Sequence, residues 1–139
     1  MNKILLVDDD PLDRLLANRT FSEMDLGCEI VDLADGQELL TYFDQEDLSG
    51  VSLVLLDLKM PRMSGLEVLR RLNDESPRML RRVPFIVMSG STIPTDVMSS
   101  YELGARAFLT KPINHADFKE AIRGIGLFWC KYAIAHPEE

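Results

Sequence analysis

Five short runs of Ile, Leu, Val and Phe recur along the chain, at residues 4–7, 30–33, 53–56, 85–88 and 107–109. The runs show almost no alternation with polar residues. This pattern favours strands that are buried on both faces of a parallel sheet.

Between these runs the apolar residues recur with a helical period. Ala17, Phe21 and Met24 lie at positions i, i+4 and i+7, so they share one face of a predicted helix. Pro11 and Pro94 are typical first residues of helices. A longer apolar stripe near the end of the chain consists of Phe118, Ala121, Ile122, Ile125, Trp129 and Tyr132.

Strand and helix signals alternate five times. This predicts an α/β fold with a doubly wound, five-stranded parallel sheet, five helices and right-handed crossovers. We expect residues 1–139 to form a single domain whose core spans about residues 3–125. The last helix is expected to extend to about residue 134, with no output domain after it. Residues 73–83 are predicted to be a long loop, which a Ser-Pro pair marks.

The composition narrows the classes of partner. The formal net charge of −8 disfavours a nucleic-acid surface, because such a surface needs basic side chains. No apolar run approaches the roughly 18 residues that a membrane span requires, so we expect no membrane partner. Cys28 and Cys130 lack the spacing of metal ligands. They suit a reducing compartment, and we expect a cytoplasmic protein with two unremarkable, half-buried thiols.

Reactive or polar side chains follow four of the five predicted strands. They are Asp8 and Asp9, Asp57, Ser89 and Lys111. Parallel strands bind ligands beyond their carboxyl ends, so these side chains should meet at one edge of the sheet. Three carboxylates there would repel one another unless a cation were bound. An all-oxygen ligand set favours Mg²⁺, and the lack of Cys or His at a strand end disfavours softer metals.

Each of these signals has a simpler interpretation when it is taken alone. The acidic run after the first strand suits a helix cap, and Asp57 suits a residue that leads into a helix. Lys111 suits a strand terminus, and Ser89 suits a turn. The conjunction of all four at strand ends is what favours a functional site.

The segments that carry these residues resemble the response-regulator receiver family of two-component phosphorelay signalling. The resemblance covers nearly the whole chain and lies in ILLVDDD (4–10), LLDLKMP (55–61), MSGLEVL (63–69) and GARAFLTKP (104–112). It implies a flavodoxin-like sheet with strand order 2-1-3-4-5.

The resemblance also implies a phosphorylation and metal site. Asp57 matches the residue that accepts the phosphoryl group and contributes to the Mg²⁺ site. Asp9 matches a direct Mg²⁺ ligand, and Asp8 matches an acid that holds the ion largely through water. The backbone carbonyl of Lys59 matches the remaining protein ligand.

Further positions match residues that sense the phosphoryl group. Ser89 matches the switch hydroxyl, Lys111 the phosphate-binding lysine, and Phe108 the aromatic switch, where Tyr is common in the family. The side chains of Lys59 and Ser91 match variable positions that tune hydrolysis. Lys59 could pair with the phosphoryl group or point to solvent, and the sequence leaves both open.

The expected partners follow from the same resemblance. They are a sensor histidine kinase or phosphotransfer protein, and a second copy bound through the last two helices and the fifth strand. The loop at 73–83, Asp13 and the GLFW sequence at 126–129 resemble single-domain regulators of phytochrome-type kinases. We expect no enzyme activity beyond self-catalysed phosphotransfer and autodephosphorylation.

Three other classes of protein compete with this interpretation. A phosphatase of the haloacid dehalogenase type resembles a different pattern, with a second Asp where this chain has Lys59. A flavin-binding module would need a phosphate loop where this chain has acids. A receiver that binds partners without phosphorylation is harder to exclude, although every side chain needed for phosphorylation is present.

Overall fold

The structure is a computed structural model, and it describes residues 2–90 and 92–133. Five parallel strands form one sheet in the order β2-β1-β3-β4-β5. The strands are β1 (Asn2–Val7), β2 (Cys28–Leu33), β3 (Val51–Leu56), β4 (Phe85–Ser89) and β5 (Ala107–Thr110). Each expected apolar run lies inside one of these strands, so the predicted fold class and strand order are confirmed.

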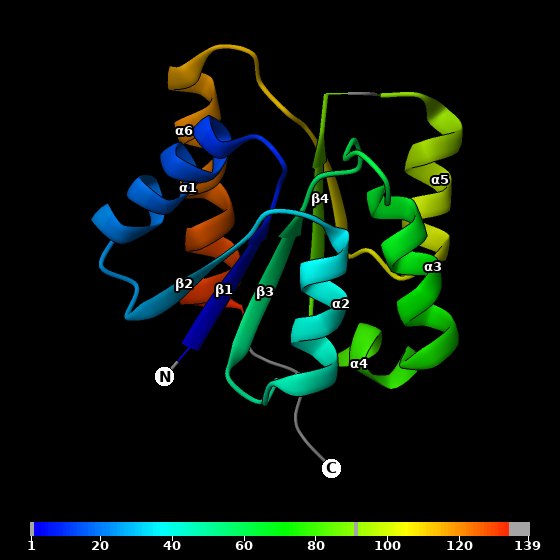
Figure 1. The fold of residues 1–139 in the computed structure, drawn as a ribbon. Coiled ribbons are helices and arrows are strands. Elements are labelled where there is room, and N and C mark those ends of the chain that lie inside the picture. Colours follow the sequence, from blue (N-terminus) through cyan, green and yellow to red (C-terminus); the bar gives the residue numbers. More distant parts are fainter. Residues whose placement is uncertain (1, 91, 134–139) are drawn as a thin grey trace.

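Helices cover both faces of this sheet, as Figure 1 shows. α1 and α6 lie on one face, and α2, α3 and α4 lie on the other, while α5 packs beside α3 and β5. None of the described helices combines the length and apolar character needed to cross a bilayer. The helices are α1 (Pro11–Glu23), α2 (Gly36–Gln45), α3 (Gly65–Glu75), α4 (Pro77–Arg82), α5 (Pro94–Glu102) and α6 (His115–Ile125).

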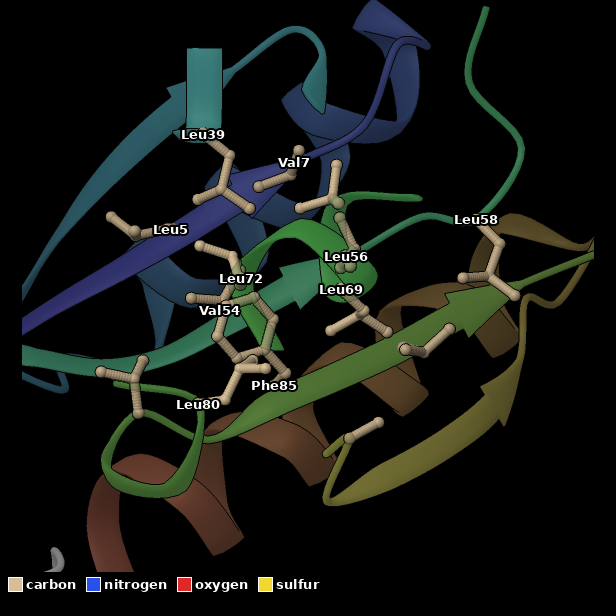
Figure 2. Packing of buried hydrophobic residues seen from close by; sticks show 14 of the residues in the cluster. Leu5, Val7, Leu39, Val54, Leu56, Leu58, Leu69, Leu72, Leu80 and Phe85 are labelled. Carbon is tan, nitrogen blue, oxygen red and sulfur yellow. The ribbon is translucent and has the colours of Figure 1, made fainter. Parts of the chain in front are cut away.

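Consecutive residues of a strand point to opposite faces of the sheet, and in this fold a hydrophobic core covers each face. In β1, Leu5 and Val7 enter the core under α2 and α3, and Ile4 and Leu6 enter the core under α1 and α6. Figure 2 shows the first of these cores, in which Leu39, Leu69 and Leu72 of the helices meet the strands. Burial on both faces explains why the central strands β1, β3 and β4 have long apolar runs, whereas the edge strand β2 includes Glu29 and Asp32.

The expectation of a loop at residues 73–83 was wrong. α3 continues to Glu75, and Pro77 then begins the additional helix α4, so the described residues form six α-helices instead of the expected five. α4 has only six residues, and Leu80, which is 2% exposed, anchors it in the core. Pro at the first turn of a helix is favourable, so the Ser-Pro pair that suggested a loop marks a helix start.

The last helix also differs from the expectation. α6 ends at Ile125, and the chain continues as a π-helical segment, η1 (Gly126–Tyr132), instead of one α-helix. In a π-helix the backbone hydrogen bonds join residues i and i+5 instead of i and i+4. The apolar stripe of α6 therefore turns toward a different side of the helix within η1. Trp129 remains packed against the core as predicted, whereas Tyr132, which we assigned to the stripe, is 67% exposed.

The packing of α4 can be tested by truncating its anchor. We expect Leu80→Ala to lower the free energy of unfolding by about 2–5 kcal/mol, because it leaves a cavity in the core. The exposed neighbour Arg78 provides a matched control, and Arg78→Ala should change stability by less than about 0.5 kcal/mol. Urea unfolding measures both variants, and equal midpoints would show that α4 does not contribute to the core.

Candidate functional site

The carboxyl ends of the strands bring the predicted site residues together. Asp8 and Asp9 follow β1, and Asp57 follows β3, where its backbone N–H donates to the carbonyl of Val7 at 2.9 Å. Ser89 ends β4, and its carbonyl accepts a 2.8 Å hydrogen bond from the backbone N–H of Lys111, just past β5. These backbone bonds fix the loops that carry the reactive groups.

One carboxylate oxygen each from Asp8, Asp9 and Asp57 lies within 4.8 Å of the other two. Ligands on opposite sides of an octahedral Mg²⁺ lie about 4.2 Å apart, given metal–oxygen distances of about 2.1 Å. Small side-chain rotations would therefore let all three oxygens approach one ion. Asp57 is only 7% exposed, whereas Asp9 is exposed, so the cluster opens to solvent on one side.

Lys111 neutralises part of this acidic cluster. Its Nζ lies 2.7 Å from Asp8 Oδ2, 2.7 Å from Asp13 Oδ2 and 3.8 Å from Asp57 Oδ2. Burial alone would lower the pKa of Lys111, but its contacts with Asp13 and Asp8 outweigh that effect and raise the pKa. Lys111 is therefore a fixed positive charge beside the carboxyl group of Asp57.

Burial works against ionisation of the central acid. Burial raises the pKa of Asp57 to about 6. The positive charge of Lys111 opposes this shift, and the negative charge of Asp8 adds to it. Burial also raises the pKa of Asp8, even though Asp8 contacts Lys111 directly. A bound cation would reverse this balance, because it favours the charged form of every carboxylate around it.

Asp13 is a site residue whose role the sequence did not reveal. It lies in the first turn of α1, where an acid is usually explained by the helix dipole. α1 begins directly beside the acidic edge, with Asp10 as its N-cap, so this turn faces Lys111. An acid three residues beyond the cap, at the same sheet edge as a lysine, is the signal that could have identified it.

The loop after Asp57 is held close to the acid. The backbone N–H of Lys59 donates to Asp57 Oδ1 at 3.3 Å, whereas its side chain is 63% exposed and its Nζ lies 4.0 Å from Asp96 of α5. A Cβ on Gly65 would lie 2.5 Å from the carbonyl oxygen of Asp57, so α3 can start here only with glycine. Ser91 lies outside the described residues.

The two predicted switch residues occupy different environments. Ser89 is fully buried at the end of β4. Phe108 of β5 is half-buried against the core under α2 and α3, and its backbone N–H donates to the hydroxyl oxygen of Tyr101 at 3.0 Å. Phe128 of η1 is 58% exposed, so its ring lies outside the core.

A doubly wound sheet of order 2-1-3-4-5, with three acids, a serine and a lysine at its carboxyl edge, defines a receiver-type signalling domain. The chain belongs to the response regulator receiver domain family, whose model matches residues 4–123. It therefore belongs to two-component signalling, as its sequence motifs suggested.

Relatives and solved structures agree with this assignment. The response regulator Rcp1 of Synechocystis sp. is 33% identical over 130 residues, which cover 91% of this chain and 87% of Rcp1. The structure of Mn²⁺-bound Rcp1 has a TM-score of 0.88 at 30% identity and covers 99% of this chain and all of that one.

Two further structures represent other ligand states. The phosphorylated cyanobacterial phytochrome response regulator RcpA has a TM-score of 0.88 at 31% identity, over 98% of this chain and 99% of RcpA. TrrA from Thermotoga maritima, in complex with Mg²⁺ and BeF, has a TM-score of 0.68 at 29% identity, over 90% of this chain and 99% of TrrA. The likeness to RcpA, a phytochrome response regulator, confirms the resemblance to phytochrome-associated regulators.

The raised pKa of Asp57 predicts how stability depends on pH when a chelator removes divalent cations. The folded state holds a proton on Asp57 up to about pH 6, whereas the unfolded state loses it near 3.8. The free energy of unfolding should therefore fall as pH rises between these values. Asp57→Asn should reduce that fall, leaving the part that comes from the raised pKa of Asp8, and it should be more stable than wild type at pH 7 by about 1–3 kcal/mol.

Urea unfolding at several pH values in chelator measures this difference. Asp44→Asn changes an exposed acid of α2 and serves as the control, with the same pH dependence as the wild type. Parallel curves for the wild type and Asp57→Asn would contradict the prediction.

Proposed function

We propose that the chain receives a phosphoryl group on Asp57 from a sensor histidine kinase or phosphotransfer protein, with Mg²⁺ as cofactor. The observation that carries this proposal is the convergence of Asp8, Asp9 and Asp57 on one edge of the sheet, with Lys111 Nζ 3.8 Å from Asp57. The structures of Mn²⁺-bound Rcp1, of phosphorylated RcpA and of TrrA with Mg²⁺ and BeF support both parts of it.

The residues that would hold Mg²⁺ are Asp8, Asp9, Asp57 and the backbone carbonyl of Lys59. Asp8 already accepts hydrogen bonds from Lys111 and from the backbone N–H of Asp10, so it suits contact through water. Asp9 is exposed beside the other two acids and suits direct coordination. When bound, the ion supplies positive charge that neutralises the oxygens of the transferring phosphoryl group.

The side chains of the chain itself perform the transfer. One oxygen of Asp57 attacks phosphorus, and the bond between phosphorus and the donor's nitrogen breaks, so that an acyl phosphate forms. Lys111 stabilises negative charge on the phosphoryl oxygens. Its contacts with Asp8 and Asp13 position the ammonium group before the donor arrives. Hydrolysis of the acyl phosphate by water then resets the site.

Exposed apolar side chains beside the acidic edge suit a docking partner. Leu12 and Leu15 of α1 are 49% and 47% exposed, and Ile113, two residues after Lys111, is fully exposed. Exposed apolar groups of this size around a polar site are typical of protein interaction surfaces. A helical partner that presents a phosphohistidine could cover them while it delivers its phosphoryl group.

Phosphorylation of the purified protein tests the proposal. With acetyl phosphate and Mg²⁺, we expect intact mass to rise by one phosphoryl group, about 80 Da, in the wild type. Asp57→Asn should not gain this mass, and neither should wild type in chelator. Asp96→Asn changes an acid that pairs with the Lys59 side chain and is not part of the acidic cluster, and it should be labelled like wild type.

Equal labelling of wild type and Asp57→Asn would exclude Asp57 as the acceptor. This labelling assay and a parallel turnover assay with a small phosphoester separate the competing classes. Sustained turnover of a small phosphoester would favour a phosphatase, whereas no labelling under any condition would favour a receiver that binds partners without phosphorylation.

We further propose that phosphorylation changes association through α5, β5 and α6. The phosphoryl group adds a charge of roughly −1.5 to −2 near Ser89 and Lys111. Movement of the Ser89 hydroxyl toward it would open space for the half-buried Phe108. One such contact supplies about 1.5–3 kcal/mol, whereas a switch from about 1:99 to 99:1 needs about 5.5 kcal/mol. Partner binding or self-association would have to provide the rest.

Sedimentation tests whether a second copy is that partner. With Mg²⁺ and beryllofluoride as a phosphoryl mimic, we expect the wild type to shift toward a dimer. Ser89→Ala should lose this shift and still accept a phosphoryl group on Asp57, because the serine is not the acceptor. An unchanged mass of wild type with and without the mimic would leave a different protein as the output partner.

A further inference from the structure

The two cysteines, which the sequence separates widely, lie together in the fold. Cys28 is the first residue of β2, and Cys130 lies in η1. Both pack against the same core, under α1 and α6, and they lie close enough that each thiol affects the pKa of the other. The Cys28 thiol also lies 3.7 Å from the carbonyl oxygen of Leu26. Both thiols are half-buried, as expected, but nothing in their sequence spacing indicated that they lie close together.

Cys130 is accessible from the end of the sheet opposite Asp57. Both cysteines are only half-buried. Cys130 and Trp129 line a cavity of about 590 Å³ at the amino ends of the strands, together with Arg82 and Arg106. A cavity of this size admits a small molecule, so a dissolved reagent can reach the Cys130 sulfur without unfolding of the domain.

We propose that Cys28 and Cys130 are an oxidisable thiol pair, which a small-molecule disulfide converts into an intramolecular disulfide between β2 and η1. The modification lies far from the acidic edge and is independent of phosphorylation at Asp57.

The reaction is two successive thiol–disulfide exchanges. The thiolate of one cysteine attacks a sulfur of oxidised glutathione, which forms a mixed disulfide and releases one molecule of glutathione. The second cysteine then attacks its neighbour's sulfur and releases the other molecule. Two protons and two electrons leave the protein, and one oxidised glutathione becomes two reduced ones.

Burial sets the rate of this reaction. It raises the pKa of Cys28, and it raises the pKa of Cys130 to about 12, with Cys28 as a further cause. Thiolate is therefore scarce at neutral pH, and the first exchange is slow. The second exchange is fast by comparison, because the second thiol packs against the same core, close to the first. An assay at about pH 8.5 brings the reaction to a convenient time scale.

The crosslink would close a loop of about 100 residues, which restricts the unfolded chain strongly. It would also join η1, where the apolar stripe changes phase, to an edge strand of the sheet. We therefore expect the oxidised protein to melt at least about 5 °C higher than the reduced protein.

Oxidised glutathione and intact mass provide the test. We expect wild type to lose about 2 Da and to carry no glutathione, whereas Cys28→Ser and Cys130→Ser should each gain one glutathione, about 305 Da. The oxidised wild type should show the higher melting temperature and return to the original value after reduction. Both serine variants should show no such reversible shift.

The other outcomes would overturn the proposal. Two glutathione adducts on wild type would mean that the sulfurs are too far apart to join. A disulfide-linked dimer would mean that the thiols react between molecules, and a wild type that stays fully reduced would mean that the pair is not oxidisable. Phosphorylation at Asp57 of the double serine variant, measured in parallel, shows that the fold and the acidic site are intact.

Discussion

The repulsion among Asp8, Asp9 and Asp57 is the constraint on which the site depends. The fold places three carboxylates within 4.8 Å of one another and buries the central one, which no folded domain would favour on stability grounds alone. Lys111 relieves part of this repulsion, and Asp13 in turn holds Lys111 at 2.7 Å. The site therefore depends on a balance between carboxylate repulsion and attraction to Lys111, so a change of one charge has a large effect there.

The rigid end of the sheet is what holds these charges in place. Hydrophobic cores cover both faces of the sheet, and backbone hydrogen bonds hold β1, β3 and β4 side by side up to their carboxyl ends. Gly65 allows α3 to approach the carbonyl of Asp57 more closely than any side chain would permit. The rigid sheet thus overcomes the mutual repulsion of the acids and keeps them ready for a cation and a phosphoryl group.

The sequence predicted the parts of the molecule that depend on strong local patterns. Continuous apolar runs predicted all five strands, and parallel strands meet at one edge, so the positions of Asp57 and Lys111 followed. α4 was missed because six residues with one buried anchor, Leu80, carry almost no periodicity. The π-helical segment and the contact between Cys28 and Cys130 depend on tertiary packing, which no spacing in the sequence encodes.

The hydrogen bond from the Phe108 N–H to the Tyr101 hydroxyl has a consequence for how copies of this chain can meet. β5 is an edge strand, and an unpaired backbone N–H on such an edge invites another strand to add to the sheet. The Tyr101 hydroxyl accepts the hydrogen bond of the Phe108 N–H, so this donor is not available to an added strand. The contact therefore opposes strand addition and aggregation. Any complex built on this face must therefore form through side chains, and a continuous sheet shared by two molecules would first have to displace Tyr101.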